Sequence, residues 1–83
     1  MNDITLEKIV EIITSVIEDI ELTIEDKDED LMQLGLDSIG FIQIVVALEE
    51  QFACEIPDEK LLFSEMNTVH KIFNVLQSAY TEN

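Results

Sequence analysis

The pattern of apolar and polar residues predicts three amphipathic helices and no strand. From about Thr5 to Ile20, apolar residues recur at helical spacing on one side, and charged and hydroxyl residues occupy the other. Asp3 or Thr5 is expected to cap this helix, because short polar side chains accept hydrogen bonds from the free N–H groups at a helix start. The apolar side consists of Leu6, Ile9, Val10, Ile13, Val16, Ile17 and Ile20.

The run from Ile39 to Phe52 predicts a second helix that is apolar on two sides. The first stripe is typical of a core-facing side and contains Phe41, Ile44, Val45, Leu48 and Phe52. The second stripe contains Ile39, Ile42 and Val46, and Ser38 lies between the stripes at the start of the helix. Such a helix is either fully buried or presents one side to a partner. We favour the partner, because a chain of 83 residues buries a smaller fraction of its surface than a larger domain.

A final helix is predicted from about Val69 to Tyr80, with Thr68 as its N-cap. Pro57 cannot continue a helix, and a short helical turn is expected from Asp58 to Phe63. The final helix has an apolar stripe of Val69, Ile72, Phe73, Leu76 and Tyr80. The long connection from Glu21 to Gln33 is acidic, and apolar residues in it and just after it are expected to hold it against the core: Leu22, Ile24, Leu31, Met32, Leu34 and Leu36.

The charge balance excludes several classes of partner. Nineteen acidic residues against four basic residues give a net charge of −15, which argues against nucleic acid and anionic membranes, because both require a basic surface. It favours partner enzymes with basic docking patches, reached through electrostatic steering. No apolar run is long enough for membrane insertion, and Met1-Asn2-Asp3 lacks the basic start of a signal peptide. With Cys54 as the only cysteine, we expect a cytoplasmic monomer without an internal disulfide.

Two candidate sites for chemistry have little support in the sequence. Asp26, Asp28 and Asp30 match the first three ligand positions of an EF-hand loop, but the glycine and the final glutamate of that loop are missing. We therefore expect no specific metal site. A nucleophile–histidine pair would need Ser38 or Cys54 to meet the single histidine, His70, through folding, and the sequence does not identify a third group to orient the histidine. No catalytic residue is predicted, and we do not expect an enzyme.

The Asp37–Ser38 pair lies where a polar loop gives way to the two-sided helix, and it allows two interpretations. Either side chain is suited to cap the helix N-terminus. Alternatively, Ser38 is an exposed hydroxyl that becomes phosphorylated or esterified, because a helix N-terminus stabilises a phosphate through its free N–H groups and its dipole. The dipeptide alone does not decide between them.

The chain resembles acyl carrier proteins and the carrier domains of polyketide and nonribosomal peptide synthesis. The resemblance is carried by Leu34-Gly35-Leu36-Asp37-Ser38-Ile39, Val46-Ala47-Leu48-Glu49-Glu50-Gln51-Phe52, Ile56-Pro57-Asp58-Glu59 and Thr68-Val69. It implies one carrier domain over residues 1–83: an all-α four-helix bundle with a short third helix and a long loop between the first two. It implies that Ser38, with Asp37 beside it in the cofactor-binding site, receives 4′-phosphopantetheine from coenzyme A through a phosphopantetheinyl transferase. The thiol of this arm would carry acyl or aminoacyl groups as thioesters between loading and condensing enzymes.

The expected docking surface is the second stripe of the two-sided helix with an acidic rim, namely Ile39, Ile42, Val46, Glu49 and Glu50. Fatty-acid carriers commonly place acidic residues in the first turns of this helix, where this chain has Gly40 and Gln43. We therefore expect a free-standing carrier of polyketide, nonribosomal peptide or related specialised metabolism. A housekeeping carrier of fatty-acid synthesis is the first alternative, and an acidic helical adaptor without a prosthetic group is the second.

Overall fold

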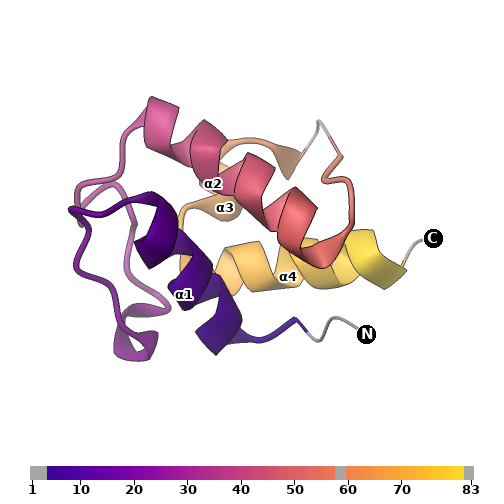
Figure 1. Ribbon diagram of the computed structural model, residues 1–83, viewed down its shortest axis with the longest axis horizontal. Coiled ribbons are helices and arrows are strands. Elements are labelled where there is room, and N and C mark those ends of the chain that lie inside the picture. The colour runs from indigo at the N-terminus through magenta and orange to yellow at the C-terminus, as the bar shows by residue number, and fades with distance from the viewer. Residues whose placement is uncertain (1–3, 58–59, 82–83) are drawn as a thin grey trace.

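The computed structural model describes residues 4–57 and 60–81, and their regular structure is helical. The elements are α1 (Leu6–Val16), a 3₁₀ turn η1 (Ile24–Asp26), α2 (Ser38–Phe52), α3 (Phe63–Met66) and α4 (Val69–Thr81). Helix α1 packs against both α2 and α4, and α3 packs on α4. The long loop between α1 and α2 lies at the end of the molecule where α2 begins (Figure 1). The prediction of an all-α bundle with a short third helix is confirmed.

The core is a continuous cluster of apolar side chains that follows the predicted stripes. Side chains from all three long helices are fully buried in it, among them Ile9, Ile13, Ile44, Leu48, Ile72 and Leu76. Burying an aliphatic side chain of this size contributes about 1.5–3 kcal/mol. The three long helices thus share one apolar core, to which residues of the connecting segments also contribute.

Two threonines cap α1 and α4 as predicted. The Thr5 hydroxyl accepts a hydrogen bond from the Lys8 N–H at 3.1 Å, and the Thr68 hydroxyl accepts one from the Lys71 N–H at 3.0 Å. Each bond satisfies a donor that has no partner within the first turn of the helix. The alternative cap, Asp3, lies outside the described residues.

Helix α1 is shorter than predicted. It ends at Val16, and Ile17 has an extended backbone with φ −109° and ψ 94°. Ile20 is buried nevertheless, but it reaches the core from the loop. The spacing of apolar residues could not reveal this, because an inward-facing residue in a loop continues the pattern of the preceding helix.

The short third helix begins later than the predicted span from Asp58 to Phe63. Leu62 has an extended backbone with φ −125° and ψ 143°, so α3 begins only at Phe63. Within the predicted span, Lys60 has 3₁₀ geometry, and its N–H donates to the Pro57 carbonyl at 2.9 Å. Residues 58 and 59 and the side chains of Phe63 and Tyr80 lie outside the description.

The long loop is attached to the core by fewer side chains than predicted. Leu22, Leu31 and Leu36 are buried, and Leu34 is half-buried. The prediction is wrong for Ile24 and Met32, which are 39 % and 50 % exposed. The loop therefore relies partly on backbone contacts for its position.

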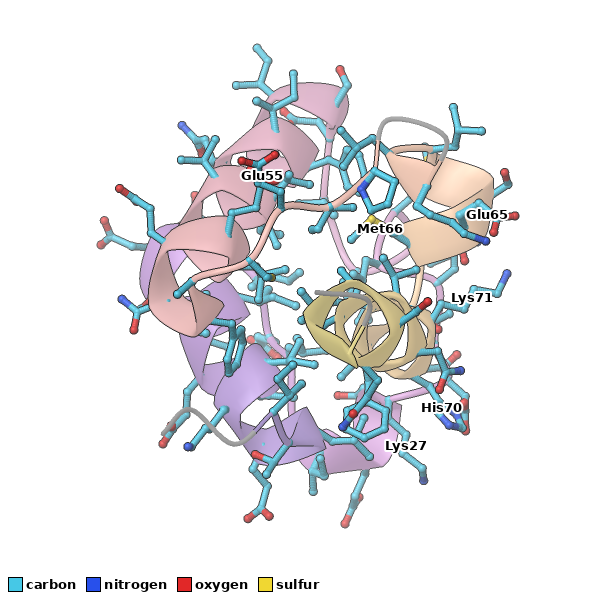
Figure 2. All side chains as sticks on the ribbon, turned by 90° about the vertical axis from the view of Figure 1, so that its right-hand side faces the viewer. Lys27, Glu55, Glu65, Met66, His70 and Lys71 are labelled. Atoms are coloured by element: carbon cyan, nitrogen blue, oxygen red, sulfur yellow. The ribbon has the colours of Figure 1, made fainter. Side chains whose placement is uncertain are left out.

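Those contacts join the loop to α4. The His70 N–H donates to the Lys27 carbonyl at 2.9 Å, and His70 Nδ1 lies 3.1 Å from a carboxylate oxygen of Asp28. The Leu31 N–H donates to the Asn67 carbonyl at 2.8 Å. Figure 2 shows Lys27 and His70 on the same side of the molecule. The loop that leads to α2 is thus fixed against the start of α4.

Candidate attachment site and docking surface

A tight turn delivers the chain to the start of α2. The Gly35 N–H donates to the Met32 carbonyl at 3.2 Å, and the Leu36 N–H donates to the Leu31 carbonyl at 3.0 Å. Gly35 has φ +112°, a conformation that residues with a side chain rarely adopt. A Cβ atom there would meet nothing within 4 Å, so the backbone conformation, and not space, requires glycine. The turn sends Leu36 into the core and places Asp37 at the start of the helix.

Asp37, and not Ser38, caps α2. Its carboxylate accepts a hydrogen bond from the Gly40 N–H at 2.7 Å, and its carbonyl accepts one from the Phe41 N–H at 2.9 Å. Ser38 is the first residue of the 15-residue helix, and it is exposed. Capping is therefore assigned to Asp37, and the Ser38 hydroxyl lies open at a helix N-terminus, where a phosphate would be stabilised. These residues fit a covalently attached phosphate ester.

Gly40 has a packing role that sequence reasoning missed. It is buried, and a Cβ atom there would lie 2.8 Å from Leu36 Cδ1, 3.1 Å from Ile17 Cδ1 and 3.2 Å from a carboxylate oxygen of Asp37. The first turn of α2 therefore lies close against the segments before it, which helps to fix the position of the attachment site. A glycine within a helical pattern is the signal for such a close approach.

The two stripes of α2 have opposite environments. The five core-facing residues are 0–7 % exposed, whereas the second stripe is 69 % exposed at Ile39, 61 % at Ile42 and 50 % at Val46. The prediction that the second stripe is not buried is confirmed. Contact of this stripe with a partner stays a prediction.

An apolar groove runs beside Ser38. It has a volume of about 400 Å³, and its lining is Ser38, Phe41, Ile42, Val45, Val46, Leu61 and Leu62. We expect one residue of the short helical turn, Leu61, Leu62 or Phe63, to face inward; Leu61 packs half-buried against the core, whereas Leu62 is 55 % exposed. The extended backbone of Leu62 accounts for this difference, and periodicity offers no signal for it.

The two acidic residues of the expected docking rim differ in the structure. A carboxylate oxygen of Glu49 accepts a hydrogen bond from the Ile56 N–H at 2.9 Å, so this half-buried side chain fixes the segment after α2. Glu50 is exposed. Of the two, Glu50 is the more accessible to a partner, and the structural role of Glu49 was missed because its hydrogen-bond partner lies seven residues away.

Cys54 is buried just beyond α2. Burial and, to a lesser extent, the nearby Glu49 carboxylate raise the pKa of its thiol. The thiol is therefore neutral and poorly nucleophilic at neutral pH, and of the two roles that the sequence allows, a small packing residue or a surface thiol, its burial fits packing.

The acidic loop uses its carboxylates to hold its own turns. The Asp26 carboxylate accepts a hydrogen bond from the Thr23 N–H at 3.0 Å, and the Asp30 carboxylate accepts one from the Met32 N–H at 2.9 Å. Asp28 faces α4 instead. Over residues 4–57 and 60–81, no three His, Cys, Asp or Glu side chains are grouped as metal ligands.

In the same described ranges, no helix is long and apolar enough to cross a membrane. No solved structure gives a significant match to the chain.

The family model described as the phosphopantetheine attachment site matches residues 7–76, which is most of the chain. Domains of this family are carriers to which 4′-phosphopantetheine is covalently attached. They interact with a phosphopantetheinyl transferase and with partner enzymes. The matched region contains both the turn at Gly35 and the exposed start of α2. The chain therefore belongs to the phosphopantetheine-attachment family of acyl and peptidyl carrier proteins.

Proposed function

We propose that Ser38 is the attachment residue and that the protein carries acyl or aminoacyl groups between enzymes without catalysing a reaction itself. The observation that carries this proposal is the exposed Ser38 hydroxyl at the start of α2, beside an Asp37 side chain that already supplies the cap. The attached arm supplies a flexible thiol that holds the cargo as a thioester. A tethered thiol presents this cargo at high effective concentration to a docked enzyme.

The loading step is a phosphoryl transfer. The Ser38 oxygen forms a bond to phosphorus, and the phosphoanhydride bond of coenzyme A breaks. Adenosine 3′,5′-bisphosphate leaves, and the serine proton passes to a base on the transferase. In this step we assign to Asp37 the orientation of the first turn of α2, because its carboxylate is bound to the Gly40 N–H.

We further propose that the pathway is polyketide, nonribosomal peptide or related specialised metabolism. The support is the sequence of α2, which has no acidic residue between Asp37 and Glu49, where carriers of fatty-acid synthesis commonly have them. Ile39, Ile42, Val46, Glu49 and Glu50 remain the proposed docking surface for the transferase and for the loading and condensing enzymes. Comparing rates of loading with fatty acyl, polyketide-type acyl and aminoacyl groups would distinguish the pathways.

The experiment that tests the attachment site is coexpression with a phosphopantetheinyl transferase, followed by intact-mass measurement. The wild-type protein should gain the mass of one phosphopantetheine group, and Ser38→Ala should gain none. Because Asp37 supplies the cap, Ser38→Ala should lose about 1 kcal/mol of stability or less.

Ser64→Ala is the matched control, because Ser64 is also an exposed serine in the first turn of a helix. It should be loaded like the wild-type protein. Mass gain by Ser38→Ala, or loss of mass gain in Ser64→Ala, would contradict the assignment of Ser38.

A further inference from the structure

We propose that Gly40 is a positioning residue for the loading of Ser38, and that the end of α1 sets the position of the attachment serine through it. The inference rests on the proposed function and adds a residue that does not touch the transferred group. Gly40 is buried, and Ser38, two residues before it, is exposed. Gly40 therefore acts through the first turn of α2 and not through contact with coenzyme A.

The cap of α2 encloses Ser38 in a hydrogen-bonded ring. Asp37 Oδ1 accepts a hydrogen bond from the Gly40 N–H at 2.7 Å, and the Asp37 carbonyl accepts one from the Phe41 N–H at 2.9 Å. Ser38 lies within the ring that the first bond closes, so its backbone follows any displacement of Asp37 or Gly40. The placement of the Ser38 hydroxyl therefore depends on the geometry of the cap.

The two glycines on either side of Ser38 meet different requirements. Gly35 has a positive φ of +112° and open space where a Cβ atom would lie. Gly40 is in α2, and a Cβ atom there would lie 2.8 Å from Leu36 Cδ1 and 3.1 Å from Ile17 Cδ1. Glycine is unfavourable within a helix, so the close approach of these two side chains is what requires glycine at position 40.

The side chains that approach Gly40 are held more firmly than the cap. Leu36 is 4 % exposed in the core, and Ile17 packs against the same core. Asp37 is exposed, and its Oδ1 atom would lie 3.2 Å from the added Cβ atom. A methyl group at position 40 therefore displaces the cap and the first turn of α2, which contain Ser38, more readily than it displaces the core.

The loading rate depends steeply on the placement of the Ser38 oxygen. A displacement of about 1 Å in a docked substrate can lower the rate of reaction by about a hundredfold. The Ser38 oxygen must meet the phosphorus of coenzyme A within the transferase complex. A shift of the first turn should thus lower the rate within the complex and leave the affinity of the transferase for the protein nearly unchanged.

The test measures single-turnover loading of the apo protein, with the transferase and coenzyme A in excess. The maximal rate constant and the transferase concentration that gives half of it are obtained separately. Gly40→Ala should lower the maximal rate constant roughly tenfold, as expected for a displacement smaller than 1 Å. The half-saturating transferase concentration should stay within about twofold of the wild type, because the change affects the reaction and not the binding.

A second substitution should restore the rate. Leu36→Val removes the Cδ1 atom that lies 2.8 Å from the added Cβ atom, so Gly40→Ala/Leu36→Val should regain most of the wild-type maximal rate. Ile17→Val removes the Cδ1 atom at 3.1 Å, so Gly40→Ala/Ile17→Val should regain part of it. Such rescue is expected only where the paired positions act through their contact.

Val75→Ala is the control for a loss of stability. Val75 is a buried side chain of α4 and does not line the groove beside Ser38. Its truncation should lower the melting temperature and leave the maximal rate within about twofold of the wild type. The atoms that approach Gly40 are the ends of side chains, so Gly40→Ala should fold; if a thermal melt shows otherwise, Gly40→Ala/Ile17→Val takes its place in the rate measurement.

Loading of Gly40→Ala at the wild-type maximal rate would overturn the inference. The same follows if only the half-saturating transferase concentration changes, if neither second substitution restores the rate, or if Val75→Ala slows loading as much as Gly40→Ala. Loading at a residue other than Ser38 would instead overturn the proposed function. Peptide mass measurement identifies the modified residue and distinguishes this outcome from a change in rate.

Discussion

The two apolar sides of α2 contain the same kinds of residue and have opposite surroundings. Ile44 and Val45 are buried, whereas Ile42 and Val46, their neighbours in the sequence, are 61 % and 50 % exposed. The buried side is covered by the rest of the bundle, and the other side adjoins the groove beside Ser38. Residue type therefore does not decide burial in this helix; the position of the neighbouring elements does.

The largest expected effect is on the buried side. Leu48→Ala should lower the free energy of unfolding by roughly 2–5 kcal/mol, because Leu48 is fully buried and its truncation leaves a cavity in a close-packed core. Urea unfolding followed by circular dichroism would measure the loss. Loading of the remaining folded protein should be unaffected, and a loss below about 0.5 kcal/mol, the range typical of surface positions, would show that the two sides of α2 do not differ as described.

A smaller effect is expected at Gly40, where α2 meets Leu36 and Ile17. Gly40→Ala favours the helix by about 1 kcal/mol, but its Cβ would lie 2.8 Å from a buried leucine methyl group. Such overpacking typically costs about 1–3 kcal/mol, so we expect a net loss of about 1 kcal/mol. Urea unfolding measures it, with the exposed Gln43→Ala as the control that should not be destabilised. A stabilised Gly40→Ala would show that the site has room for a methyl group.

The smallest expected effect on stability is on the exposed side. Val46→Ala should change the free energy of unfolding by no more than about 0.5 kcal/mol, as is usual for surface positions. The kcat/KM for its loading by a phosphopantetheinyl transferase should fall, because Val46 belongs to the proposed docking surface. Thermal melts and apo-to-holo conversion would test both statements. If Val46→Ala were destabilised as strongly as Leu48→Ala, both stripes of α2 would belong to the core.

Local patterns were enough to predict most of the bundle. The stripes of α1, α2 and α4 and the caps Thr5 and Thr68 follow from spacing and residue type, because helical periodicity and capping involve residues three or four positions apart. The end of α1 at Val16 and the start of α3 at Phe63 could not be predicted from spacing and residue type. Apolar residues outside a helix, such as Ile20 in the loop after α1 and Leu62 before α3, continue the helical spacing of their neighbours, so their spacing does not mark a helix boundary.

The sequence by itself determined the helices, the net charge of −15 and the position of Ser38 at the start of a two-sided helix. Only the tertiary structure decided that Asp37 supplies the cap and that Glu49 binds the Ile56 N–H. It also decided that Leu62 joins the exposed stripe of α2. These features depend on distances between segments, which are set when the whole chain packs and which no local repeat of residues contains.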